Sequence, residues 1–308
     1  MDTLLTYVIV TPARNEAQFI ELAIKSVIEQ TKRPLKWVIV SDGSTDGTDD
    51  IVRKYAAEYS WIELVRMPER QERDFAGKVY SFDAGYKCTR DLKYDVIVSL
   101  DADISFGEDY FAYLLQKLTS DPGLGLVGTP FKEGSNITYD YRFVNIEHVS
   151  GACQVFRRRC FEEIGGYKPV KSGCIDHIAV VSARMKGWKT RTFTERVCFH
   201  HRAMGTAQQN VVAARFKGGR KDYLIGNHPV WELSRVAYQL SRRPIIIGGL
   251  MLACGYAWAM IRREQRPVSR ELVAFVRREQ IGRLKSFLMR SRLTKKQQPP
   301  KEATSACS

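Results

Sequence analysis

The sequence predicts an α/β fold whose central sheet is mostly parallel, Rossmann-like, and covered by helices on both faces. Over residues 7–130, short apolar runs rich in valine and isoleucine alternate with segments whose apolar residues recur at helical spacing. Strands that are apolar along their whole length are typical of parallel sheets buried on both faces. Ligands of such sheets bind beyond the carboxyl ends of the strands, and polar residues follow several of these runs.

The predicted elements follow one another in a regular order. Strands are expected within residues 7–12, 37–44, 62–67, 95–103 and 123–130. Helices are expected between them, at residues 16–30, 46–59, 76–88 and 108–118. Beyond residue 130 the alternation loosens into an α+β pattern, with a strand at 151–159, a short helix at 160–167 and an amphipathic helix at 176–188.

Charge and cysteine usage narrow the class of protein. The 308-residue chain has a formal net charge of +14, which predicts a polyanionic partner such as nucleic acid, anionic lipid or a phosphorylated substrate. Its seven cysteines are scattered singly, which argues against a disulfide framework or a zinc site and favours a reducing compartment. The first residues lack the charged and apolar regions of a signal peptide, so secretion is not expected.

The composition changes after residue 228. Residues 245–261 form an uncharged, mostly apolar run of 17, flanked on each side by a pair of arginines. A helix of that length spans about 25 Å, which is short for a bilayer core of about 30 Å. Residues 262–296 hold 12 Lys/Arg against 3 Asp/Glu, and positive-inside bias opposes moving such a segment across a membrane. A re-entrant or in-plane helix on the cytoplasmic leaflet is favoured, and the alternatives are a buried helix hairpin or a dimer interface.

Two aspartates mark the most informative strand end. Asp101 and Asp103 close the run VIVSLDAD, and alternate side chains of a strand share one face, so the two carboxylates are expected side by side. Mg²⁺ and Mn²⁺ are often bound by one or two carboxylates together with substrate phosphates. The alternative is that Asp103 caps the following helix while Asp101 is solvated. Asp42 ends an earlier strand and can accept a bond from a ribose hydroxyl or a base, or else form an Asx turn.

Taken together, five motifs resemble those of the family 2 glycosyltransferases of the GT-A fold. They keep the order and approximate spacing of that family over roughly residues 5–228. The motifs are TPARNEA (11–17), VIVSDGSTDGT (38–48), SLDAD (99–103), GACQVFRRRCFEEIGGY (151–167) and IDHIAVVSARMKGWK (175–189). Residues 199–229 and the apolar run after them resemble a bacterial subgroup that builds exopolysaccharide or related surface glycans.

The resemblance implies a division of the chain. Residues 1–228 would form the GT-A domain, with a nucleotide-sugar-binding half at 1–130 and an acceptor-binding half at 131–228. Residues 229–293 would form a helical, basic and apolar region that associates with membrane, and residues 294–308 a disordered tail.

The resemblance also implies roles for single residues. Asp103 would bind the metal that bridges the donor diphosphate, with His200 or His201 completing the shell, and His200 is preferred. Asp176, at the start of its helix, would be the catalytic base that takes the proton of the acceptor hydroxyl, although an N-cap role is the alternative. The residues implied in binding the nucleotide sugar are Pro12, Arg14, Asn15, Glu16, Asp42, Lys78, Asp101, Ala102, Gly151, Arg157 and Arg220.

Two departures from the family pattern concern this site. The chain has Phe82-Asp83-Ala84-Gly85 where many relatives place an asparagine before the glycine. At residues 175–177 it has Ile-Asp-His where the family usually presents an acidic pair. Two interpretations are open for Arg157 and Arg220. Each guanidinium either binds phosphate or the acceptor, for which its bidentate geometry is suited, or belongs to a solvated basic surface.

The sequence therefore predicts a metal-dependent, inverting glycosyltransferase that uses Mn²⁺ or Mg²⁺. It would move a sugar from a nucleotide-diphosphate donor to a polyprenyl-diphosphate-linked or growing glycan acceptor at the cytoplasmic face of the plasma membrane. We expect the basic charge to bind anionic membrane lipid and not nucleic acid. Whether the protein forms a homo-oligomer is left open. The rivals are a sugar nucleotidyltransferase, which would need a glycine-rich phosphate loop that TPARNEA lacks, and a non-catalytic scaffold of a glycan assembly.

Overall fold

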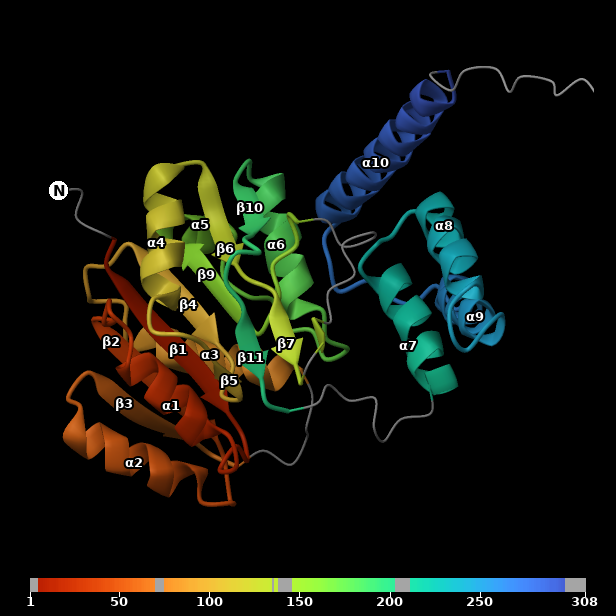
Figure 1. Cartoon of the computed structure of the whole chain (residues 1–308). Coiled ribbons are helices and arrows are strands. Elements are labelled where there is room, and N and C mark those ends of the chain that lie inside the picture. Colours follow the sequence, from red (N-terminus) through yellow and green to blue (C-terminus); the bar gives the residue numbers. More distant parts are fainter. Residues whose placement is uncertain (1–4, 70–74, 135, 138–145, 203–210, 297–308) are drawn as a thin grey trace, which may run out of the picture. The chain divides into compact units, whose positions relative to one another are not determined.

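The computed structural model describes residues 5–69, 75–134, 136–137, 146–202 and 211–296 (Figure 1). The chain forms two compact units, Met1–Gln209 and Asn210–Ser308. Helix α7 (Val211–Leu224) belongs to the second unit by this division. The sequence pattern had instead placed the change in composition after residue 228, beyond α7.

The first unit contains a seven-stranded sheet in the order β10-β6-β9-β4-β1-β2-β3. Strands β4, β1, β2 and β3 run parallel to one another, as do β10 and β6, while β9 is antiparallel to both of its neighbours. The predicted mostly parallel sheet is confirmed. Its strands are β1 (Tyr7–Ala13), β2 (Lys36–Asp42), β3 (Ile62–Met67), β4 (Val96–Leu100), β6 (Leu124–Gly128), β9 (Cys153–Arg157) and β10 (Lys189–Thr192).

Helices cover both faces of this sheet (Figure 1). On one face the main core joins alternate residues of β1 and β2, such as Ile9 and Ile39, to buried side chains of α1 (Ile20–Ile28), α2 (Thr48–Glu58) and α4 (Tyr110–Ser120). On the other face Phe156 of β9 packs on Phe161, which also contacts Phe82 of α3. The helices of that face are α3 (Ala76–Lys87), α5 (Arg158–Glu163) and α6 (Ile175–Met185).

A small second sheet lies beside the carboxyl end of β4, because its strand β5 follows β4 directly in the chain. It has the order β5-β11-β7-β8, formed by β5 (Ile104–Ser105), β11 (Cys198–His200), β7 (Phe131–Glu133) and β8 (Asn136–Ile137). Strand β11 pairs antiparallel with β5, which places His200 opposite Ile104, the residue after Asp103. Residues that are almost 100 positions apart in the sequence therefore meet beside the acidic strand end.

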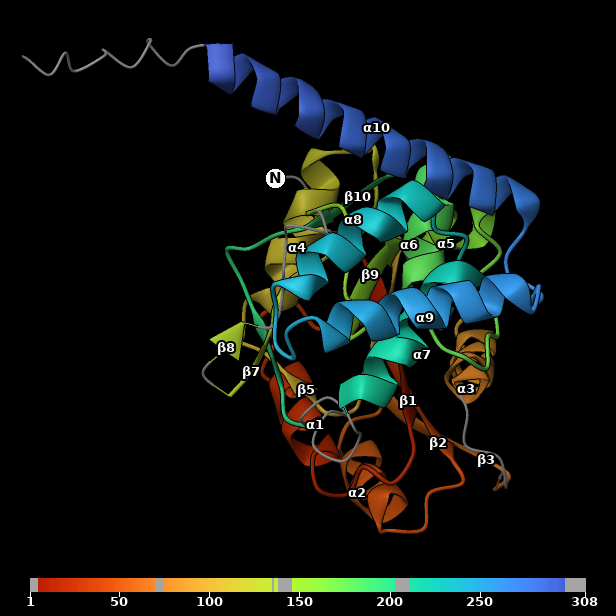
Figure 2. The ribbon, with the colours of Figure 1, turned by 90° about the vertical axis from the view of Figure 1, so that its right-hand side faces the viewer.

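The second unit is helical and consists of α7, α8 (Pro229–Leu240), α9 (Ile247–Ile261) and α10 (Arg270–Lys296). Figure 2 shows α8 and α9 side by side, and α9 also packs against α7. The α7–α9 contact is backbone to backbone: a Cβ added at Gly219 would lie 1.9 Å from the carbonyl oxygen of Leu252, and one at Gly255 would lie 2.0 Å from that of Phe216. Only glycine permits this approach.

The apolar run of the sequence lies mainly in α9, a helix of 15 residues. One side of α9 is buried in the unit, at Leu252, Tyr256 and Ala259, whereas Ile247, Leu250, Trp258 and Ile261 are exposed. Within the described parts of the chain, every helix is too short or too polar to traverse a bilayer.

The glycine contact gives a matched pair of variants. Gly219→Ala should destabilise the second unit by about 3 kcal/mol or more, because the new methyl group overlaps a backbone oxygen that cannot turn aside. Gly218→Ala is the control, because its Cβ would lie 3.5 Å from the Leu252 side chain, an ordinary contact. The control should be neutral or stabilising by up to about 1 kcal/mol. Calorimetric unfolding of the full chain measures both, and equal effects of the two variants would contradict the packing described.

Candidate functional site

Three parallel strands end at one edge of the large sheet, and each is followed by polar residues that the sequence singled out. Asp42 is the last residue of β2, Arg14 follows β1, and Asp101 follows β4. The register pairs Val10 with Val38 on one side and with Ser99 on the other, so these ends are level with one another. The expected gathering of polar side chains at the carboxyl edge is therefore present.

The loops after β1 and β2 are tied together by hydrogen bonds. Asn15 has a left-handed backbone (φ 55°), and its side-chain oxygen accepts a bond from the Thr45 N–H at 2.9 Å. The N–H of Glu16 donates to the Thr48 hydroxyl at 2.8 Å. Asp42, at the end of β2, is buried, and its carboxylate lies 3.7 Å from the Arg14 guanidinium. Pro12 lies in β1, opposite Val40 of β2.

Lys78 of α3 neutralises Asp101. Its ammonium group forms an ion pair with the Asp101 carboxylate and donates to the carbonyl oxygen of Gly151 at 3.4 Å. Burial raises the pKa of Asp101, although the Lys78 charge acts in the opposite direction. Burial alone would lower the pKa of Lys78, but the Asp101 carboxylate leaves that pKa raised. Ala102, between the two aspartates, is buried and turns toward the core.

Asp103 faces His200 across the small sheet. The Nε2 atom of His200 lies 3.5 Å from Asp103 Oδ2, and its Nδ1 atom lies 3.1 Å from Glu133 Oε1. A carboxylate on the far ring nitrogen fixes the orientation of an imidazole that binds metal through the near one. His201 points elsewhere, because its ring bonds to the Ser105 hydroxyl at 2.7 Å. Of the two histidines, the structure turns His200 toward Asp103.

This pair fits a divalent cation that takes further ligands from a substrate. Among the residues that the structure describes, no three histidine, cysteine, aspartate or glutamate side chains converge on a common metal position. Asp103 and His200 offer one carboxylate oxygen and one imidazole nitrogen, both nearly buried. Mg²⁺ and Mn²⁺ commonly combine so few protein ligands with water and phosphate oxygens. A metal here would take its remaining ligands from water or from phosphate oxygens.

Arg202 is a member of the site for which the sequence indicated no role. Its guanidinium forms an ion pair with Glu16, lies over the ring of Phe19 at 5.5 Å, and places Nε 3.5 Å from Asp103 Oδ2. Burial, together with the nearby charge of Asp103, raises the pKa of Glu16 to about 7. Arg202 and Glu16 are 186 positions apart, so no local pattern could have paired them.

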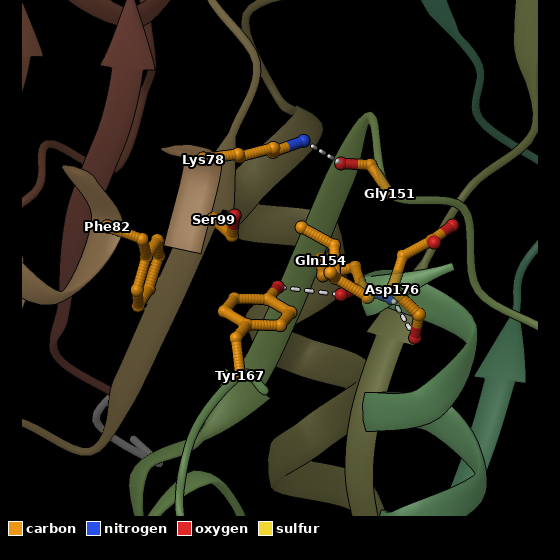
Figure 3. A pocket seen from close by; sticks show the side chains of 8 residues that line it. Lys78, Phe82, Ser99, Gly151, Gln154, Tyr167 and Asp176 are labelled. Carbon is orange, nitrogen blue, oxygen red and sulfur yellow. Dashed lines mark hydrogen bonds between the residues drawn. The ribbon is translucent and has the colours of Figure 1, made fainter. Parts of the chain in front are cut away.

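Asp176 lies at a small pocket on the other side of Lys78 (Figure 3). Helix α6 begins at Ile175 and its N-cap is Cys174, so Asp176 is inside the first turn and is not the N-cap. Gly151 leaves room for it, since a Cβ at Gly151 would lie 3.1 Å from Asp176 Oδ2. The residues lining the pocket are Lys78, Phe82, Ser99, Gly151, Gln154, Tyr167, Ile175 and Asp176.

Gln154 connects the two walls of this pocket. Its side-chain oxygen accepts a bond from the Tyr167 hydroxyl at 2.6 Å, and its amide nitrogen donates to the carbonyl oxygens of Val149 at 3.1 Å and Asp176 at 3.4 Å. Figure 3 shows Tyr167 and Asp176 approaching Gln154 from opposite sides. The loop that carries Gly151 and the helix that carries Asp176 are thus held by one buried side chain.

Arg157 is not part of this site, which corrects the expectation that it binds the donor. Strand β9 is antiparallel to β4 and pairs Arg157 with Val96, at the end of β4 away from Asp101. Its guanidinium donates to the carbonyl oxygens of Leu118 at 2.7 Å and Leu124 at 3.1 Å. The sequence did not reveal the strand direction, and that direction decides where Arg157 lies.

Arg220 belongs to the second unit. It lies in α7 and its Nε atom donates to both carboxylate oxygens of Glu264, at 2.9 and 2.8 Å. Its contact with phosphate stays a prediction.

The fold is that of the GT-A class of glycosyltransferases. The chain belongs to glycosyl transferase family 2, whose model matches residues 8–185. Among curated proteins it is 29% identical over 117 residues to the poly-beta-1,6-N-acetyl-D-glucosamine synthase of Staphylococcus aureus (strain COL), a match that covers 38% of this chain and 26% of that protein. It is also 29% identical over 145 residues to the probable glycosyltransferase YdaM of Bacillus subtilis, covering 46% of this chain and 33% of that one.

Solved structures share the fold. The mannosyltransferase PcManGT from Pyrobaculum calidifontis, in complex with GDP-Man and Mn²⁺, superposes with a TM-score of 0.57 at 22% identity, over 89% of this chain and 79% of that chain. S. aureus TarS 1-349 in complex with UDP-GlcNAc gives a TM-score of 0.55 at 13% identity, over 82% and 72%. The chain spans only a quarter to a third of the length of the curated relatives named above.

Proposed function

We propose that the protein transfers a sugar, with inversion, from a nucleotide-diphosphate donor to a glycan acceptor, with Mn²⁺ or Mg²⁺ as its cofactor. One observation carries this proposal: Asp42, Asp101 and Asp103 lie along one sheet edge, and Asp176 faces Lys78 from the adjoining helix. The corner formed by Arg14, Asn15 and Glu16 would hold the nucleoside beside Asp42, and Asp103 with His200 would hold the metal.

The chemistry follows from where each group lies. When bound, the divalent cation stabilises the negative charge that develops on the departing diphosphate. Asp176 takes the proton of the acceptor hydroxyl as that oxygen attacks the anomeric carbon. Lys78 pairs with Asp101 and leaves Asp176 without a direct ion pair among the described residues, so Asp176 is free to act as the base. Gln154 holds the backbone of Asp176 in place.

The rival functions differ in their products. A sugar nucleotidyltransferase would release pyrophosphate, whereas a glycosyltransferase releases the nucleoside diphosphate. A non-catalytic scaffold would release neither. UDP-GlcNAc and GDP-Man are the first donors to test, because the structural relatives carry them. Acceptors to test are polyprenyl-diphosphate-linked sugars and short glycans, the latter because a curated relative makes a polysaccharide.

Asp176→Asn tests the assignment of the base. The variant should lose transfer by a factor of about 10² to 10⁴, because the amide cannot accept the proton, while binding of the nucleoside diphosphate with Mn²⁺ is unchanged. Asp91→Asn is the control, since Asp91 is an exposed carboxylate outside the site. Transfer is measured as release of the nucleoside diphosphate in the presence of acceptor. An Asp176→Asn enzyme as active as the control would reject Asp176 as base.

We further propose that the protein works at the cytoplasmic face of the plasma membrane, held there by α9. Ile247, Leu250, Trp258 and Ile261 recur at helical spacing and are each at least half exposed. Arg262 follows directly, with its guanidinium 5.0 Å from the centre of the Trp258 ring. An apolar stripe with an indole and arginines at its end fits a helix that lies in the plane of an anionic lipid surface. Docking there would bring the enzyme to lipid-linked acceptors.

Leu250→Asp tests this docking surface. The variant should bind phosphatidylglycerol vesicles about tenfold or more weakly, because a buried leucine contributes about 1.5–3 kcal/mol. Leu22→Asp is the control, because Leu22 is an exposed leucine of α1, in the first unit. Vesicle co-sedimentation at low and high salt measures both. If Leu250→Asp binds vesicles as well as the unmodified protein, the exposed stripe of α9 does not contact lipid. If the substitution splits a dimer, the stripe contacts a second copy of the chain.

A further inference from the structure

Arg202 occupies an unusual position between two carboxylates. Its Nη2 atom bonds to Glu16, and the same nitrogen donates to the carbonyl oxygen of Asn15 at 3.4 Å. Its Nε atom lies 3.5 Å from Asp103 Oδ2, and although the side chain is partly exposed, this one atom is buried and makes no hydrogen bond to any of the described residues. A buried guanidinium N–H that lacks a partner is costly, so the side chain is poised for an acceptor that arrives with a ligand.

The charges around Arg202 show what that acceptor is. Asp103 is shared between His200 and Arg202, both 3.5 Å from the same oxygen. A divalent cation bound by Asp103 and His200 would therefore lie close to the guanidinium, and the two positive charges would repel each other. An anion that binds the cation and offers a second pair of oxygens to the guanidinium removes this conflict. A diphosphate has that chemistry, and a guanidinium can bind phosphate oxygens in a bidentate manner.

We propose that Arg202 is a counter-ion of Asp103 in the donor-free protein and exchanges Asp103 and Glu16 for the diphosphate when metal and nucleotide bind together. Glu16 holds the guanidinium within reach of the metal position, and Phe19 supports its planar face. This inference rests on the proposed function, because it assumes a metal at Asp103 and a nucleoside diphosphate beside it. This arrangement would make the binding of metal and of nucleotide depend on each other. A metal ion alone is repelled by the positive charge of Arg202, and a nucleotide alone has no metal ion to bind its diphosphate.

Binding measurements without turnover test the proposal. Arg202→Gln should bind Mn²⁺ alone about fivefold or more tightly than the unmodified protein, a coupling at the lower end of the usual range between bound groups. The same variant should bind UDP or GDP in saturating Mn²⁺ about tenfold more weakly, because it loses a charge-assisted contact to phosphate. Free Mn²⁺ is followed by its paramagnetic resonance signal, and nucleotide binding by calorimetry.

Two further variants make the result specific. Arg196→Gln is the matched control, because Arg196 is a half-exposed arginine that pairs with Asp109 away from the site, and it should leave both affinities unchanged. Arg202→Lys keeps the charge without the planar fork, so it should keep weak binding of Mn²⁺ alone and recover nucleotide binding only in part. Unfolding temperatures check that each variant is folded.

The outcomes separate this inference from the proposed function. If the unmodified protein binds UDP or GDP with Mn²⁺ but Arg202→Gln matches it in both affinities, the role of Arg202 is overturned and the proposed function stands. If Arg202→Gln weakens Mn²⁺ binding, Arg202 is not a competitor of the metal and the inference fails. If the unmodified protein shows no Mn²⁺-dependent nucleotide binding, the proposed function and the inference fall together.

Discussion

The structure depends on the pairing of buried carboxylates with cations at the carboxyl edge of the sheet. Removing an ionised carboxylate from water, even in part, is costly unless a partner of opposite charge meets it. Lys78 meets Asp101, while Arg202 meets Glu16 and approaches Asp103. The donor-free protein is therefore stable with three acids at one edge. A ligand that brings both a cation and phosphates can exchange these pairs without leaving a charge uncompensated.

The fold gathers these charges from distant parts of the chain. The parallel strands deliver Asp101 and Asp103 to the edge, α3 supplies Lys78, and the small sheet returns His200 to a position opposite β5. Glu133 orients the His200 ring through its second nitrogen. Each group lies on or directly beside a helix or strand, which favours a precise arrangement of the site.

The sequence predicted the α/β fold, the strand ends and the acidic residues, because strand periodicity and the positions of Asp42, Asp101 and Asp103 are local signals. It did not predict where Arg157 lies, since an apolar run looks the same in a parallel and an antiparallel strand. Nor could it pair Arg202 with Glu16 or Glu133 with His200, because those contacts arise only when the small sheet closes on β5. The apolar run at 245–261 was visible as a pattern, but its division into a face buried in the unit and an exposed stripe required the packing of α9.

We propose that Asp103 and His200 hold a divalent cation whose coordination shell is completed by the donor diphosphate. The most direct measurement is a crystal structure of the protein with MnCl₂ and UDP or GDP, read by anomalous scattering at the manganese edge. We expect one manganese peak within bonding distance, about 2.0–2.3 Å, of an Asp103 carboxylate oxygen and of His200 Nε2, with diphosphate oxygens among its other ligands. A nucleotide bound at this edge with manganese elsewhere, or with none, would contradict it.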